Sequence, residues 1–176
     1  MTNPRPDVSD PDWIEWFSKK MDEASPREEA FWERMRRVAK VRDEILGSVP
    51  MVDEDEACIL LGLSETVPSA TLFHREVECQ ILRFNIEGQA AYPLFQFDVA
   101  GQRVYPALIE LMRMRPNDWG GQMAFLHWLT RPNRSLGGAR PCDRLAKDAE
   151  AIVTSYGAEI SRLCVGRVFG SKGGLN

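Results

Sequence analysis

The chain has 176 residues, of which 44% are hydrophobic and 27% are charged, and its formal net charge is −4. This length and hydrophobic fraction predict one substantial core, or a core with an appendage. The acidic balance argues against a protein that mainly holds nucleic acid. No apolar run approaches the roughly 20 residues that cross a bilayer. Residues 1–9 are polar and contain prolines, unlike a signal peptide, so we predict a cytoplasmic protein with no membrane partner.

Charge is unevenly distributed along the chain. Residues 1–56 carry 9 basic and 15 acidic residues, whereas residues 131–176 carry 8 basic and 4 acidic ones. An acidic front and a basic end predict different surfaces for different partners. The cysteines and histidines are widely spaced and form no ligand motif, so we predict reduced cysteines that mostly pack, no metal and no cofactor. These residues are Cys58, Cys79, Cys142, Cys164, His74 and His127.

Residues 1–48 are predicted to form a helical extension. Asp10 and Pro11 favour the start of a short helix, and residues 25–28 form a capping box for a second helix that reaches about Leu46. The apolar residues of the second helix recur at helical spacing, so they form one face that must pack against another apolar surface. That surface belongs either to the chain's own core or to a second copy of the chain. We favour a dimer contact made by Phe31, Met35, Val38 and Ile45.

Residues 49–98 are predicted to form a helix-turn-helix-like region with a small hairpin. Asp53 and Glu56 form a capping box for a helix that ends at Gly62, and Ser64 caps a second helix to about residue 76. Short strands on both sides of residues 87–88 predict the hairpin.

This order of elements resembles the winged helix-turn-helix of excisionase-like DNA readers. A recognition helix needs basic and amide side chains aimed at bases and phosphates. The second helix instead carries Glu65, Glu76 and Glu78 beside His74 and Arg75. We therefore favour a structural helix-turn-helix, and keep a DNA-binding transcriptional autoregulator as the alternative function.

Residues 99–165 are predicted to be helical, with helices over 104–115, from Asn117 to 129 and from Pro141 to 163. Between the last two lies a connector, residues 128–142. In it Pro132 ends one helix, Gly137 and Gly138 supply turn geometry, and Pro141 suits the first turn of the next. Such a connector fixes the angle at which the last helix leaves the core. Residues 166–176 are predicted to be a flexible basic tail.

Signatures of catalysis are missing from the sequence. No phosphate-binding glycine loop follows a strand, and no serine or cysteine has a histidine base near it in sequence. The neighbouring carboxylates Asp53 and Asp55 sit at a helix start, where the helix dipole explains them. We therefore predict that the protein is not an enzyme. An enzyme would instead need a pocket that contains titratable groups with shifted pKa values.

A series of short motifs runs in order through residues 50–160. The motifs are Tyr92-Pro93-Leu94-Phe95-Gln96-Phe97-Asp98, Val104-Tyr105-Pro106, Trp119, Phe125, Trp128-Leu129, Pro132-Asn133, Leu136-Gly137-Gly138 and Pro141. Together they resemble the toxin-binding domain of the MbcA/ParS/Xre-type antitoxins. An N-terminal helical extension joined to such a domain is similar in layout to ParS. The resemblance implies a mainly α fold: a multi-helical toxin-binding domain over residues 99–165, with a degenerate helix-turn-helix and a small β-hairpin before it.

The resemblance also implies a function. The chain would be the antitoxin of a type II toxin–antitoxin system, and its partner a RES-domain toxin with an ADP-ribosyltransferase-like fold. Such a toxin consumes NAD or uses it to modify a protein, and the C-terminal part of the antitoxin lies over the NAD pocket. A homodimer within a toxin–antitoxin hetero-oligomer is expected. The sequence departs from the family pattern at Ala139-Arg140, where a hydroxyl residue commonly precedes the proline.

The C-terminal segment supplies the predicted toxin contacts. It is the basic part of the chain, and its glycines would let it enter a cleft. We expect the connector to aim this segment, with the contacts beyond the connector. The alternative is a solvated tail that contacts nothing. The predicted contacts, which would block NAD entry, are Arg144 and Arg162 on the last helix and Arg167, Phe169 and Lys172 in the tail.

Overall fold

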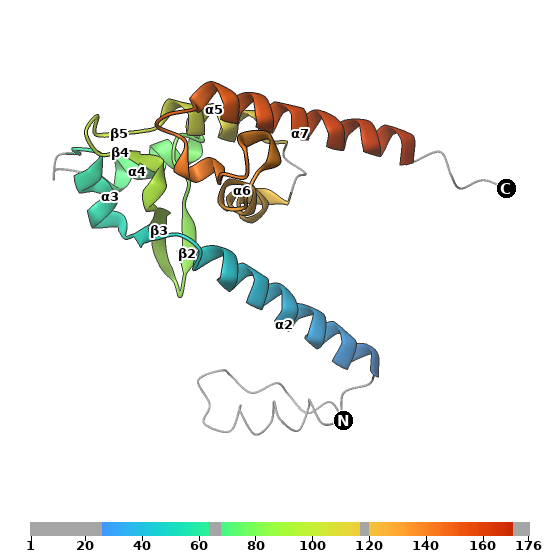
Figure 1. The fold of residues 1–176 in the computed structure, drawn as a ribbon. Coiled ribbons are helices and arrows are strands. Elements are labelled where there is room, and N and C mark those ends of the chain that lie inside the picture. The colour runs from blue at the N-terminus through green and yellow to red at the C-terminus, as the bar shows by residue number, and fades with distance from the viewer. Residues whose placement is uncertain (1–25, 64–67, 117–119, 171–176) are drawn as a thin grey trace, which may run out of the picture. The chain divides into compact units, whose positions relative to one another are not determined.

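The computed structural model describes residues 26–63, 68–116 and 120–170, with side chains given except at 68–69 and 163–170 (Figure 1). The chain divides into two compact units, Met1–Glu44 and Ile45–Asn176. The predicted boundary after residue 48 lies close to this division. The predicted short helix after Asp10 lies outside the described residues.

The first unit contains most of one long helix, α2 (Pro26–Leu46). Proline at the first helical position costs nothing, because the amide it lacks would have no partner there. The predicted end near Leu46 is confirmed. Leu46 is the only buried residue of α2, and it belongs to the second unit. The helix therefore contributes almost nothing to a core through the residues of the first unit.

The second unit is mainly helical with short antiparallel strands, which confirms the predicted mainly α class. Its α-helices are α3 (Glu54–Leu60), α4 (Pro68–Val77), α5 (Pro106–Met114), α6 (Gly121–Thr130) and α7 (Ala149–Gly170). Its strands are β1 (Met51–Val52), β2 (Phe84–Ile86), β3 (Gln89–Pro93), β4 (Phe97–Asp98) and β5 (Arg103–Val104). Short 3-10 turns are η1 (Leu94–Gln96), η2 (Arg134–Leu136) and η3 (Pro141–Asp143).

The predicted hairpin is confirmed as the β2–β3 pair, with Phe84 opposite Ala91. Both turn residues, Glu87 (φ 53°) and Gly88 (φ 85°), adopt left-handed backbone angles, which match the twist of the strands they join. Strand β1 pairs antiparallel with β3, so the sheet order is β1-β3-β2, and β4 pairs with β5 separately.

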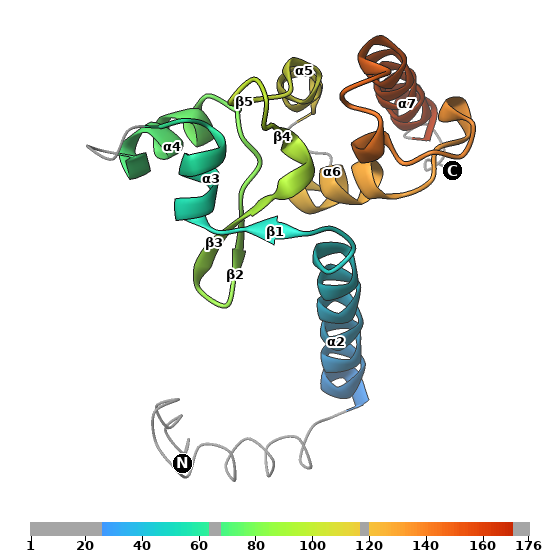
Figure 2. The same ribbon diagram turned by 60° about the vertical axis from the view of Figure 1, so that its left-hand side comes forward.

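The predicted helix-turn-helix outline is present. Asp53 accepts a hydrogen bond from the Glu56 amide (2.9 Å), and Glu56 accepts one from the Asp53 amide (3.1 Å), so the predicted capping box is confirmed. Gly62 has the left-handed angle expected just after a helix end (φ 61°). Helices α3 and α4 lie beside each other, and α3 lies next to β3 (Figure 2). The predicted cap Ser64 lies outside the described residues.

One core serves the whole second unit. Fully buried side chains come from both sides of the predicted boundary at residue 98, so that boundary separates no units. The polar Gln96 joins this core because its side chain accepts from the Leu82 amide (2.8 Å) and donates to the Leu82 carbonyl (3.0 Å). The largest fully buried side chains are Trp128, Tyr92, Tyr156, Phe125, Leu72, Leu82, Leu108, Leu111, Leu126, Leu129 and Ile152.

Four predicted boundaries are wrong. Helix α6 begins at Gly121, because Gly120 at its N-cap has a left-handed backbone (φ 68°), and the predicted cap Asn117 lies outside the described residues. Pro141 begins the single turn η3 and not the last helix, and the Arg144 carbonyl then accepts from the Asp148 amide (2.8 Å) to close a further turn. Helix α7 begins only at Ala149, and it continues through Gly170, so the predicted flexible tail is helical in its first five residues. Likewise α5 begins at Pro106, because Val104 pairs with Phe97 of β4 and the Tyr105 amide donates to the Gln96 carbonyl (3.0 Å). Within the described ranges, no helix is both long and apolar enough to cross a membrane.

Candidate functional site

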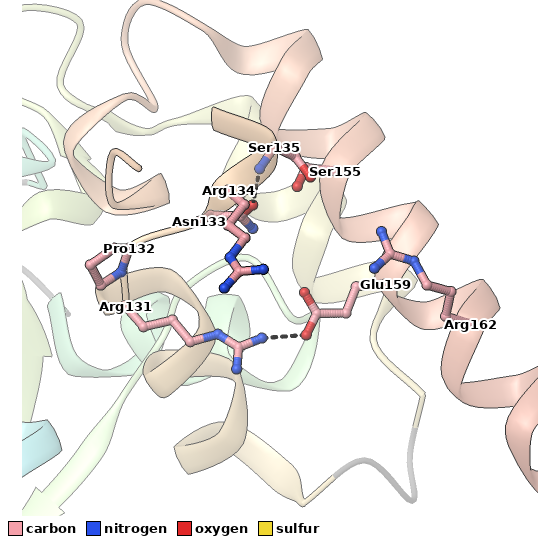
Figure 3. A pocket seen from close by; sticks show the side chains of 8 residues that line it. All are labelled: Arg131, Pro132, Asn133, Arg134, Ser135, Ser155, Glu159 and Arg162. Carbon is pink, nitrogen blue, oxygen red and sulfur yellow. Dashed lines mark hydrogen bonds and ion pairs between the residues drawn. The ribbon is translucent and has the colours of Figure 1, made fainter. Parts of the chain in front are cut away.

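A cleft of about 420 Å³ lies between the connector that follows α6 and the exposed side of α7 (Figure 3). Its lining combines charged, amide and hydroxyl side chains and includes no aromatic residue. The lining residues are Arg131, Pro132, Asn133, Arg134, Ser135, Ser155, Glu159 and Arg162.

A buried tryptophan anchors this cleft to the core. Trp128 is 1% exposed and packs on Tyr156, with ring centroids 4.6 Å apart. Its indole Nε1–H donates to Glu159 Oε2 at 2.7 Å, which satisfies a buried donor. Arg131 forms an ion pair with the other oxygen of the same carboxylate. Glu159 therefore ties the end of α6 to the middle of α7, and both its oxygens are engaged.

The connector is held by its own backbone, as its prolines and glycines predict. The Asn133 amide donates to the Ala139 carbonyl (3.0 Å), and the Gly138 amide donates to the Asn133 carbonyl (2.9 Å). The Asn133 side chain accepts from the Ser135 amide (2.9 Å). Gly137 (φ 66°) and Gly138 (φ 85°) occupy the left-handed region that other residues reach only with strain. A connector with these bonds presents its side chains from a fixed frame.

Two arginines of the cleft lack a counter-ion. Arg134 and Arg162 are exposed, and neither makes an ion pair or a side-chain hydrogen bond within the part of the chain that the structure describes. In Figure 3 their guanidinium groups face the hollow on either side of Glu159. Because Arg131 already balances Glu159, the cleft keeps two uncompensated positive charges.

A second hollow of about 460 Å³ continues this surface along α7. It shares Ser135 and Ser155 with the cleft and is otherwise lined by Glu150, Ala151, Thr154 and Ala158. Small side chains on this side of α7 leave room for a partner to approach the helix closely. The cleft is thus the basic end of a longer surface that runs along α7.

The predicted toxin contacts separate in the structure. Arg162 lines the cleft, whereas Arg144 lies in the turn before α7, where it pairs with Asp148 (2.8 Å). This corrects its predicted place on the last helix. Arg167 and Phe169 belong to α7, but the structure does not describe their side chains. Lys172 lies outside the described residues.

Sequence reasoning missed Arg131, Arg134 and Glu159. It singled out the connector but placed the contacts beyond it. One available signal was that Glu159 and Arg162 are three residues apart and therefore share a helix face. The other was that the rigid connector carries three arginines, Arg131, Arg134 and Arg140.

The four predicted dimer residues differ in their burial. Phe31, Met35 and Val38 are 53%, 44% and 56% exposed, so they remain available to a second copy. Ile45 is half-buried and packs against the core of the second unit. The structure therefore gives Ile45 a role in the fold, which the dimer prediction did not foresee.

The surface of α4 does not resemble a DNA-reading helix. Its exposed side chains include Phe73 and Val77, at 61% and 66% exposed. Glu76 accepts a hydrogen bond from the Tyr92 hydroxyl (2.9 Å) and pairs with Arg83 (3.4 Å). Burial, together with this bond to Glu76, raises the pKa of Tyr92. Glu76 thus braces α4 against the hairpin, and the helix presents apolar groups where phosphate contacts would need cations.

Titratable groups near η3 serve the fold. Cys142 is buried in the core, as the packing prediction expects, and this burial raises the pKa of its thiol to about 11. Arg140 donates to both oxygens of Asp143 at 2.8 Å, and these bonds hold the pKa of that carboxyl below its usual value.

Cys79 differs from the packing prediction because it is exposed. Over the residues that the structure describes, no cluster of His, Cys, Asp or Glu could hold a metal ion.

No family model, curated protein or solved structure matches this chain. Its function must therefore be argued from its own residues. The cleft offers guanidinium, amide and hydroxyl groups from a fixed frame, and this chemistry suits the binding of anionic groups.

Proposed function

We propose that the protein is the antitoxin of a type II toxin–antitoxin system. Its partner is a RES-domain toxin that consumes NAD or ADP-ribosylates a protein, and its C-terminal region blocks the NAD pocket of that toxin. The motifs that resemble the MbcA/ParS/Xre-type toxin-binding domain support this proposal. Several of them meet in space: η1 contacts η3, η3 contacts α6, and η2 contacts α7.

The observation that carries the proposal is the surface made by the connector and α7. Arg134 and Arg162 project from a frame that Trp128 and Glu159 fix to the core. Arginine on such a frame is well suited to anchor a protein partner, because little side-chain freedom is lost for each bond it forms. The surface thus has the rigidity and the charge that an inhibitory interface needs.

The apolar face of α2 supports a homodimer within the complex. Phe31, Met35 and Val38 step by four and three residues along one side of the helix, the spacing of a helix–helix seam. All three are exposed in the single chain. Pairing of two α2 helices would remove this surface from water, and the free energy of burying apolar area would drive the association.

The test is co-expression with the protein encoded by the neighbouring gene, which the proposal predicts to be a RES-domain toxin. We expect the toxin alone to stop growth, and the full chain to restore growth and to co-purify with the toxin. A variant that ends after Val165 removes the last turns of α7 and the residues beyond them, and we expect it to restore growth less well. If the full chain neither restores growth nor co-purifies with the toxin, the proposal is wrong.

The same purified protein tests the alternative of a transcriptional autoregulator. Affinity for the DNA upstream of its own gene is measured over a series of salt concentrations, because phosphate contacts make protein–DNA binding steeply salt-dependent. We expect weak binding with no preference for this DNA. Tight, sequence-specific binding by a chain that does not inhibit the toxin would establish the regulator instead.

A further inference from the structure

The cleft holds a positive charge that its own residues do not balance. Glu159 is its only acidic lining residue, and its two oxygens are already occupied by the Trp128 indole and by Arg131. Arg134 and Arg162 therefore face the same hollow without a counter-ion among the described residues. Two like charges that share one hollow repel each other, and an anion bound between them would relieve this repulsion.

Neutral donors surround the same space. The side-chain oxygen of Asn133 accepts from the Ser135 amide, which leaves its NH₂ group to donate elsewhere. The hydroxyls of Ser135 and Ser155 also line the cleft, and Ser155 is 7% exposed. The connector that carries Asn133 and Ser135 is fixed by its own hydrogen bonds, so these two residues need little ordering when a ligand arrives.

We propose that this cleft binds the phosphate group of a small phosphorylated ligand. A phosphate monoester carries about −1.5 to −2 charges at pH 7, which matches the two free guanidinium groups, whereas a carboxylate carries only −1. Arginine binds phosphate oxygens through two parallel hydrogen bonds, and the hydroxyl and amide groups supply further donors.

The chemistry of the lining also defines what is not recognised. None of the eight lining residues is aromatic, so a nucleobase would find no stacking surface in the cleft. The cleft therefore recognises the ligand through its phosphate groups. An inorganic diphosphate and a nucleoside diphosphate supply the same group and should bind alike.

This site goes beyond the proposed antitoxin function and does not depend on it. Both use Arg134 and Arg162, so a bound phosphate would compete with a protein partner for the same side chains. Binding of the small ligand is measured on the purified chain alone. A failure of one proposal is therefore distinct from a failure of the other.

The experiment is isothermal titration calorimetry of the full chain with pyrophosphate at fixed ionic strength. We expect saturable binding by the wild type, and a loss of affinity of roughly tenfold for each arginine removed, so about 100-fold for Arg134→Gln/Arg162→Gln. The matched control is Arg36→Gln/Arg113→Gln, which removes the same charge from exposed positions outside the cleft. The control should bind within twofold of the wild type.

Further titrations identify the ligand class. ADP should bind like pyrophosphate, and adenosine should not bind. Circular dichroism confirms that both double variants are folded. The proposal is overturned if pyrophosphate gives no saturable binding, if the Arg134→Gln/Arg162→Gln variant binds as the control does, or if the dicarboxylate glutarate binds as tightly as pyrophosphate.

Discussion

The two longest helices, α2 and α7, use their apolar residues in opposite ways. Helix α2 has 21 residues and buries only Leu46, while it leaves Phe31 and Val38 more than half exposed. Helix α7 has 22 residues, and in its first turns Ile152 and Tyr156 are fully buried. The described outer side of α7 carries small and charged side chains.

The difference shows what each helix requires. Helix α7 is held by the core of its own unit, so its exposed side can carry charge for recognition. Helix α2 exposes the apolar side chains of Phe31, Met35 and Val38, so we expect a partner to pack on this face. A contact to the toxin is therefore expected on α7, and a contact between copies on α2.

The largest effect is expected at the anchor of α7. Trp128→Ala removes a fully buried ring and leaves Glu159 without its indole donor, so it should lower the free energy of unfolding by about 3–5 kcal/mol. The measurement is urea unfolding followed by circular dichroism. Val41→Ala on α2, at a position that is 52% exposed, is the control, and it should cost less than about 0.5 kcal/mol. Equal losses in the two variants would contradict the contrast between the helices.

The next largest effect is expected on association through α2. Phe31→Asp/Val38→Asp would bury carboxylates in the seam of a dimer, so it should raise the Kd of dimerisation by about 100-fold or more. Light scattering after size exclusion measures the oligomeric state. The chain should remain folded, because neither residue belongs to the core. A wild-type chain that is monomeric at high micromolar concentration would refute the dimer.

A smaller effect is expected in the connector that aims α7. Gly138 has φ 85° with no atom near the position of an added side chain, so any cost of substitution comes from the backbone alone. Gly138→Ala should lower the free energy of unfolding by about 1–2 kcal/mol. Gly138→Asn should cost less, because asparagine tolerates left-handed angles better than alanine does. Equal costs for the two variants in urea unfolding would remove backbone strain as the explanation.

The smallest effect concerns the Arg140–Asp143 pair at the turn η3, which precedes α7 in the chain. Its lowered pKa means that ionised Asp143 stabilises the fold above the ordinary pKa, near 3.9, and that this contribution is lost as pH falls through the lower folded value. Asp143→Asn should therefore cost less than about 1 kcal/mol at pH 7, because the pair is partly exposed. In urea unfolding the difference from the wild type should shrink below pH 4. A difference that stays constant or grows would contradict this assignment.

Local chemistry made part of the fold predictable. The Asp53–Glu56 capping box, the turn at residues 87–88 and the end of α2 each depend on a few neighbouring residues, and each is confirmed. The start of α7 was mispredicted for the same reason. Pro141 fits the first position of a 3-10 turn as well as that of an α-helix, and burial of Cys142 and Leu145 in the core accompanies the shorter turn.

The cleft could not be derived from local rules. Glu159 lies 28 residues from Arg131 and 31 residues from Trp128 in the sequence, and these three meet only once α6 and α7 pack. Composition did show that the C-terminal segment is basic. It could not show which arginines are balanced, since Arg131, Arg140 and Arg144 have acidic partners whereas Arg134 and Arg162 have none among the described residues.

The central claim is that the basic surface of the connector and α7 inhibits a NAD-consuming toxin. The most direct measurement is the rate of NAD consumption by the purified RES-domain toxin as this protein is added. We predict full inhibition by the wild type and by Arg36→Glu/Arg113→Glu, and at least a tenfold higher half-inhibitory concentration for Arg134→Glu/Arg162→Glu. Equal inhibition by all three proteins would contradict the claim.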